Sequence, residues 1–185
     1  MPIIDLSPNA GQLIDQTATL LFDAFRNRTE DWQDLESARQ EVLSSLAADR
    51  VSRVLLDESS SVLGWIGGIS MYGGRVWELH PLVVATSHRR QGIGRALVQD
   101  LERVVAARGA LTLFLGSDDE HGETTMSGVD LYPDIPGAIR DLRKVGGEHP
   151  LEFYRSLGFR VVGAMPDANG LGKPDILFAK RIGRI

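Results

Sequence analysis

The segment from residue 88 to residue 95 combines glycine and arginine in a pattern that suits an anion. Arg89, Gly92 and Gly94 have the spacing Arg-x-x-Gly-x-Gly, between an expected strand and an expected helix. Glycines let backbone N–H groups approach a ligand closely, and the start of a helix carries partial positive charge. Arg90 and Arg95 add positive charge beside them. We therefore expect a pyrophosphate site here, with a tight turn bearing solvated arginines as the alternative.

An apolar segment at 77–84 carries a carboxylate and an imidazole. On a strand, Glu78, His80 and Leu82 point to the same face. This pattern favours a general base near an amine, although a solvated face or a structural network would also explain it. Pro81 cannot donate a ladder hydrogen bond, so we expect the sheet to be interrupted there. The N–H of Leu82 would then be free to polarise a carbonyl oxygen.

Tyr154 lies in the run Leu151–Phe159, which we expect to begin as a short helix. A tyrosine in such a place is most often a packing residue. The chemical interpretation is a proton donor, because a phenol with a pKa of about 10 suits a thiolate leaving group.

An acidic stretch contains no lysine or arginine between Arg108 and Arg140. It is either a solvated loop or an electrostatic well that attracts a polycationic substrate. Its acids are Asp118, Asp119, Glu120, Glu123, Asp130 and Asp134.

The elements that would position these residues begin with two helices. Apolar residues recur at helical spacing in 11–26 and in 34–48, after a short strand at 3–6. The polar segment 27–33 between the helices contains Trp32, which is either packed at the surface or part of a lid that contacts substrate.

The rest of the chain alternates strands and helices. We expect a β-meander at 51–56, 62–72 and 75–85, with a hairpin at Gly73-Gly74. A helix from about 93 to Gly109 leads to a strand at 111–115, and then to an irregular region at 112–139. A helix at 150–157 and strands at 159–165 and 176–179 complete the chain. The pattern predicts a single α+β domain over 1–185 whose mixed sheet has one parallel crossover.

Composition narrows the function classes. The chain has 185 residues, no cysteine and a formal net charge of -5. Disulfides, thiolate metal sites and a cysteine nucleophile are therefore excluded, and we expect no metal and no nucleic-acid partner. The longest uncharged stretch near the middle, 59–74, has 16 residues and is too short to span a bilayer. No signal peptide is evident, so we expect a cytoplasmic protein without a membrane partner.

The Arg89, Gly92 and Gly94 pattern at the start of a helix resembles the acyl-CoA site of the GNAT superfamily of N-acetyltransferases. The order of the elements is similar too, including the late helix that bears Tyr154. The resemblance implies a central mixed sheet that is mostly antiparallel, splayed in the middle and flanked by helices. It also implies that acetyl-CoA is the cosubstrate.

Longer runs resemble the aminoglycoside 6'-N-acetyltransferases within that superfamily, specifically the chromosomal dimeric type. They cover roughly the last 110 residues, whereas the N-terminal part and the loop at 120–123 diverge. The runs are WELHPLVV (77–84), RRQGIGRALV (89–98), LGSDDEHGETTMSGVDLY (115–132), HPLEFYRSLGFRVVGAMPDANGLGKPDI (149–176) and AKRI (179–182).

This closer resemblance implies acetyl transfer to the 6'-amine of an aminoglycoside by a homodimer. Glu78 would act as the base, directly or through water, with His80 beside it, and Tyr154 would face the sulfur. Glu78, Asp118 and Asp119 would contact the cationic acceptor. The implied cofactor-binding residues are Leu82, Val83, Val84, Arg89, Arg90, Gln91, Gly92, Ile93, Gly94 and Arg95.

We expect direct attack of the amine on the thioester, because no cysteine or Ser–His–Asp pattern offers an acyl-enzyme route. Three alternatives remain open. The acceptor could be another amine, such as a polyamine, a metabolite or a protein amine. The chain could instead be a non-catalytic acyl-CoA-binding module or, less plausibly, a nucleotide-binding module.

Overall fold

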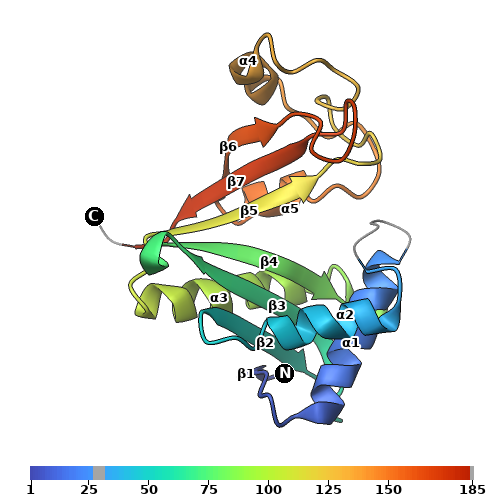
Figure 1. The fold of residues 1–185 in the computed structure, drawn as a ribbon, viewed down its shortest axis with the longest axis vertical. Coiled ribbons are helices and arrows are strands. Elements are labelled where there is room, and N and C mark those ends of the chain that lie inside the picture. The colour runs from blue at the N-terminus through green and yellow to red at the C-terminus, as the bar shows by residue number, and fades with distance from the viewer. Residues whose placement is uncertain (27–31, 184–185) are drawn as a thin grey trace. The chain divides into compact units, whose positions relative to one another are not determined.

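The computed structural model describes residues 1–26 and 32–183. They form two compact units (Figure 1). Unit 1 comprises Met1–Leu111 with Ile182–Ile185, and unit 2 comprises Thr112–Arg181. The expectation of a single domain stays a prediction.

Unit 1 is built on four antiparallel strands in the order β1-β2-β3-β4. The expected meander is confirmed, and a short 3₁₀ turn at Tyr72–Gly74 closes the hairpin between its last two strands. Gly73 and Gly74 both adopt positive φ there, as a tight hairpin requires. The strands are β1 (Ile3–Asp5), β2 (Arg50–Leu56), β3 (Val62–Met71) and β4 (Val76–Val84).

Three helices cover this sheet. Helices α1 (Gly11–Phe25) and α2 (Leu35–Ser44) lie on one face, and α3 (Ile93–Ala107) lies on the other (Figure 1). A capping box between Asp34 and Ser37 starts α2. The helix ends earlier than the predicted residue 48. The Ser45 hydroxyl donates to the Val42 carbonyl at 2.6 Å and so offers this backbone group an alternative to another helical turn.

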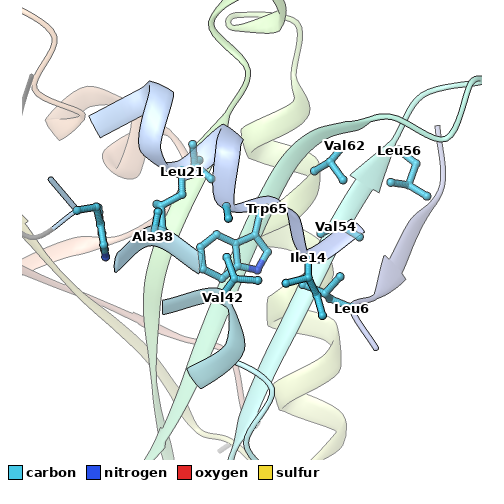
Figure 2. Packing of buried hydrophobic residues seen from close by; sticks show 12 residues of the cluster. Leu6, Ile14, Leu21, Ala38, Val42, Val54, Leu56, Val62 and Trp65 are labelled. Atoms are coloured by element: carbon cyan, nitrogen blue, oxygen red, sulfur yellow. The ribbon is translucent and has the colours of Figure 1, made fainter. Parts of the chain in front are cut away.

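The core beneath α1 and α2 is centred on Trp65 of β3. Figure 2 shows its indole among Ile14, Leu21, Ala38 and Val42. Trp65 is fully buried, and its Nε1–H donates to the Ser52 hydroxyl at 2.8 Å. Ser45 at the end of α2 joins Ser52 at 2.9 Å. Because this polar link is buried and satisfied, it fixes α2 on the sheet.

Unit 2 contains three antiparallel strands in the order β5-β7-β6, together with two short helices. Helix α4 was missed in the region expected to be irregular. It has six residues, starts at the N-cap Asp134 and includes both proline and glycine, so it leaves no helical periodicity in the sequence. The elements are β5 (Thr112–Asp118), α4 (Ile135–Arg140), α5 (Leu151–Ser156), β6 (Arg160–Met165) and β7 (Asp175–Arg181).

Among the described residues, none of the helices has the length and apolar character that crossing a bilayer requires.

Candidate active site

The interruption expected at Pro81 is confirmed as a bulge between β3 and β4. Leu79 pairs with Gly68 and Leu82 pairs with Ile66, so β4 has two residues, His80 and Pro81, opposite Gly67 alone. The His80–Pro81 peptide is cis. A Cβ on Gly67 would collide with the carbonyl oxygen of His80. Glycine is therefore required where β3 passes the bulge.

The bulge corrects one expectation about β4. Leu79 pairs with Gly68 and Leu82 pairs with Ile66. Both β3 residues face α3, so Leu79 and Leu82 also point toward α3. Glu78 pairs with Ile69 and points to the other face, as does His80. The prediction that Leu82 shares a face with Glu78 and His80 is therefore wrong, because the extra residue reverses the alternation.

Glu78 and His80 are both half-buried on the face that carries α1 and α2. A cavity of about 370 Å³ adjoins His80. The ring of Trp32 lies 6.1 Å from the His80 ring and 5.1 Å from the Phe25 ring, measured between centroids. Trp32 is 8% exposed and lines the cavity, whereas residues 27–31 of the expected loop lie outside the described residues.

The arginine and glycine segment forms the turn into α3, as expected. Gly92 is the N-cap of this helix with φ 86°, a left-handed conformation that favours glycine, and no side chain caps the helix. The first N–H groups of α3 therefore remain available to an anion. Arg89, Arg90, Gln91 and Arg95 are exposed around them. Ile93 differs, because its side chain is buried against β3, so only its backbone can serve a ligand.

In unit 2, Tyr154 lies on α5 within an aromatic cluster. Its ring centroid lies 5.1 to 5.6 Å from those of Phe153, Phe159 and Phe178. Burial raises the pKa of the Tyr154 phenol, which keeps the hydroxyl protonated. Within the described part of the chain, no hydrogen bond is found for this hydroxyl. It is therefore available as a donor.

Asp118 and Asp119, at the end of β5, differ in what their carboxylates do. Asp118 is exposed and accepts a hydrogen bond from Asn169 at 2.6 Å. Asp119 is 1% exposed and accepts bonds from the backbone of Glu123 and from both the N–H and the hydroxyl of Thr124. Asp119 thus organises the loop that follows. Two other acids of the stretch, Asp130 and Asp134, likewise accept from nearby backbone N–H groups.

His149 is a buried residue that sequence reasoning missed. Its Nδ1 accepts from the Leu151 N–H at 3.1 Å, and its Nε2 lies 3.4 Å from the Ser117 carbonyl oxygen. The imidazole therefore joins the start of α5, the helix that bears Tyr154, to β5. Burial lowers the pKa of His149, outweighing the opposing effects of the Ser117 carbonyl and the acidic Asp119 and Glu123. The only sequence signal is its place just before the helix-starting Pro150.

The lowered pKa of His149 predicts a loss of stability in acid. With a folded-state pKa below the unfolded value, the stabilisation is complete above about pH 6.5 and is lost as pH falls toward the folded pKa. Urea unfolding at several pH values between neutral and mildly acidic should show this loss. A His149→Asn variant should be less stable overall but show a weaker dependence on pH. An unchanged dependence in the variant would assign the loss to other groups.

No group of three or more metal-ligating side chains occurs in 1–26 or 32–183 that could hold a metal ion.

The chain belongs to the GNAT family of acetyltransferases. The model of that family matches residues 14–124, more than half of the chain. No curated protein matches the chain in sequence.

Comparison with solved structures shows which members of this family the chain resembles. A crystal structure of an aminoglycoside 6'-N-acetyltransferase complexed with coenzyme A has a TM-score of 0.90 and 40% identity, covering 98% of this chain and 97% of that one. The aminoglycoside 6'-N-acetyltransferase from Enterococcus faecium has a TM-score of 0.88, with the same identity and coverage. The type Ii aminoglycoside 6'-acetyltransferase has a TM-score of 0.75 and 36% identity, again covering 98% and 97%. The chain therefore has the α+β GNAT fold, in which a mostly antiparallel sheet is flanked by helices.

Proposed function

We propose that this chain is an acetyl-CoA-dependent aminoglycoside 6'-N-acetyltransferase. The observation that carries the proposal is its 40% identity, over 98% of its length, to an aminoglycoside 6'-N-acetyltransferase complexed with coenzyme A. Two features of the residues themselves support it: the uncapped start of α3, and the half-buried Glu78 and His80, of which His80 lines a cavity.

Acetyl-CoA fits the turn into α3 chemically. The pyrophosphate would accept hydrogen bonds from backbone N–H groups of Gln91–Arg95, with Arg89, Arg90 and Arg95 supplying positive charge. Leu82, Val83 and Val84 would offer backbone contacts to the acetyl and pantetheine groups. The bulge puts the side chains of Leu82 and Val84 on the face of α3 and those of Glu78 and His80 on the face of α1 and α2.

The transfer would proceed by direct attack. Glu78, or a water that it holds, takes a proton from the ammonium of the acceptor, and the free amine attacks the thioester carbon. The second proton leaves the nitrogen for solvent as the carbon–sulfur bond breaks, and Tyr154 or solvent protonates the departing thiolate. The N–H of Leu82 would stabilise the oxyanion, and Asp118 would attract the cationic acceptor. Much of the acceleration would come from holding the two substrates together.

Replacing Glu78 with glutamine should lower kcat/KM by only about tenfold at neutral pH, because positioning supplies much of the rate. The deficit should shrink as the pH rises, since more of the acceptor amine is then already deprotonated. A pH–rate profile of wild type and Glu78→Gln measures this. A deficit that stays constant with pH would contradict proton removal as the role of Glu78.

We propose further that the chain acts as a single-domain homodimer in the cytoplasm. The homodimer rests on the resemblance to the dimeric type of these enzymes, and the location rests on the intracellular supply of acetyl-CoA. Sedimentation equilibrium of the purified chain would test the homodimer, since a monomeric mass at micromolar concentration would rule it out.

The proposed regiochemistry is tested by the product. The enzyme is incubated with acetyl-CoA and a kanamycin-type acceptor, and NMR locates the acetyl group. Acetylation at the 6'-amine supports the proposal, and acetylation of another amine contradicts it. A parallel panel of polyamines and protein amines tests the alternative acceptors. Binding of acetyl-CoA without turnover on any amine would favour a non-catalytic module.

A further inference from the structure

The cavity next to His80 is lined mainly by one helix. Four of its lining residues lie on α2. One of them is a carboxylate, Glu41, that the sequence did not single out. Trp32 and His80 also line it, and all the described lining residues lie within unit 1. The α2 residues are Ser37, Gln40, Glu41 and Ser44.

The carboxylate of Glu41 is incompletely satisfied. Its Oε1 is buried, and within the described residues this atom has no hydrogen-bond partner. Arg50 forms an ion pair with this carboxylate, but its Nη1 lies 3.6 Å from Oε1, beyond the 2.7–2.9 Å of a charge-assisted hydrogen bond. Arg50 therefore neutralises this carboxylate only in part, and an ammonium group in the cavity that the Glu41 side chain lines gains electrostatic affinity.

The rest of the cavity suits a sugar that carries an amine. Gln40 and Ser44 present an amide and a hydroxyl, which can exchange hydrogen bonds with sugar hydroxyls. Trp32 offers an aromatic ring, to which both apolar surface and cations are attracted. A neutral apolar ligand would leave the carboxylate unsatisfied.

Glu41 is held on a rigid element. Ala38 and Val42 of α2 are fully buried, and the capping box of Asp34 and Ser37 fixes the start of the helix. The buried link from Ser45 to Ser52 and Trp65 fixes its end. A carboxylate on such a helix is positioned before the ligand arrives, which lowers the entropic cost of binding.

We infer that Glu41 determines acceptor specificity by binding a second ammonium group of the acceptor, distinct from the amine that is acetylated. His80 lines the cavity, and Glu78 lies two residues from it on the same face of β4, so the inference places one acceptor molecule across both carboxylates. The site would favour acceptors with several amines over monoamines. The identity of the acceptor rests on the proposed function.

The test compares Glu41→Gln with Glu36→Gln, an exposed carboxylate on the same helix outside the cavity. The acceptors are aminoglycosides that keep the 6'-amine but each lack one other amine. We expect Glu41→Gln to raise the acceptor KM by about tenfold or more, with most of the effect in KM rather than kcat. One deaminated analogue should show almost no difference between wild type and Glu41→Gln. Glu36→Gln should match wild type throughout.

Calorimetric titration of the acceptors, in the presence of coenzyme A, separates this inference from the proposed function. Absent turnover by wild type would refute the proposed function, while weaker binding to Glu41→Gln would still support the role of Glu41. Equal binding of the acceptors to wild type and Glu41→Gln, or no binding to wild type, would overturn the role of Glu41. Glu41→Asp keeps the charge and should recover part of the affinity. Thermal unfolding of each variant verifies that it is folded.

Discussion

Replacing Gly67 with alanine should lower kcat/KM for acetyl transfer by about 100-fold or more. The reason is that a displacement of the reacting groups by about 1 Å lowers the rate by about this factor. The added Cβ would collide with the carbonyl oxygen of His80, a backbone atom that cannot rotate away. The bulge would have to move, and with it both His80 and Leu82. Overpacking of this kind also destabilises a fold by about 1–3 kcal/mol. Steady-state kinetics and urea unfolding measure the two effects.

Gly11→Ala is the matched control, because nothing lies within 4 Å of a Cβ added at that position. It should leave both activity and stability close to those of wild type. A Gly67→Ala enzyme that kept its activity within twofold would contradict the role given to the bulge.

Replacing Tyr154 with phenylalanine should lower kcat by about 10- to 100-fold, because the variant lacks the proton donor and solvent replaces it only in part. The packing should survive, because the ring remains among Phe153, Phe159 and Phe178. The affinity for acetyl-CoA should change little. Single-turnover kinetics with saturating acetyl-CoA would isolate the chemical step.

The raised pKa of Tyr154 adds a second expectation for this residue. Since burial favours the neutral phenol, the wild-type rate should show no decline from Tyr154 ionisation up to about pH 10. An acetyl donor with a better leaving group than coenzyme A, such as S-phenyl thioacetate, should narrow the gap in rate between wild type and Tyr154→Phe. An equal gap with both thioesters would argue that Tyr154 is only a packing residue.

Much of the fold could be predicted from local pattern. The meander of unit 1 followed from β-branched runs and the Gly73-Gly74 hairpin, and α3 followed from its apolar spacing after Gly92. Helix α4 could not be predicted, because six residues with a proline and a glycine carry no periodicity. Its start depends on the Asp134 carboxylate, which accepts from the Gly137 N–H.

The candidate site was predicted only in part, for a geometric reason. Glu78, His80 and the turn at Arg89–Arg95 stood out through residue type and spacing. The side chain of Leu82 points to the opposite face because of how β4 pairs with β3 near Pro81. The sequence of β4 alone does not show this pairing register. His149 and Glu41 were missed for a similar reason. His149 is buried beside Ser117, and Glu41 lies beside the cavity at His80, and both contacts join residues that are distant in sequence.

The most direct test of the central claim is the release of free thiol from acetyl-CoA with matched aminoglycosides. One member of each pair carries a 6'-amine and the other a 6'-hydroxyl. We predict thiol release with the 6'-amine compounds alone. Equal release with both members, or no release with either while acetyl-CoA still binds, would contradict transfer to the 6'-amine.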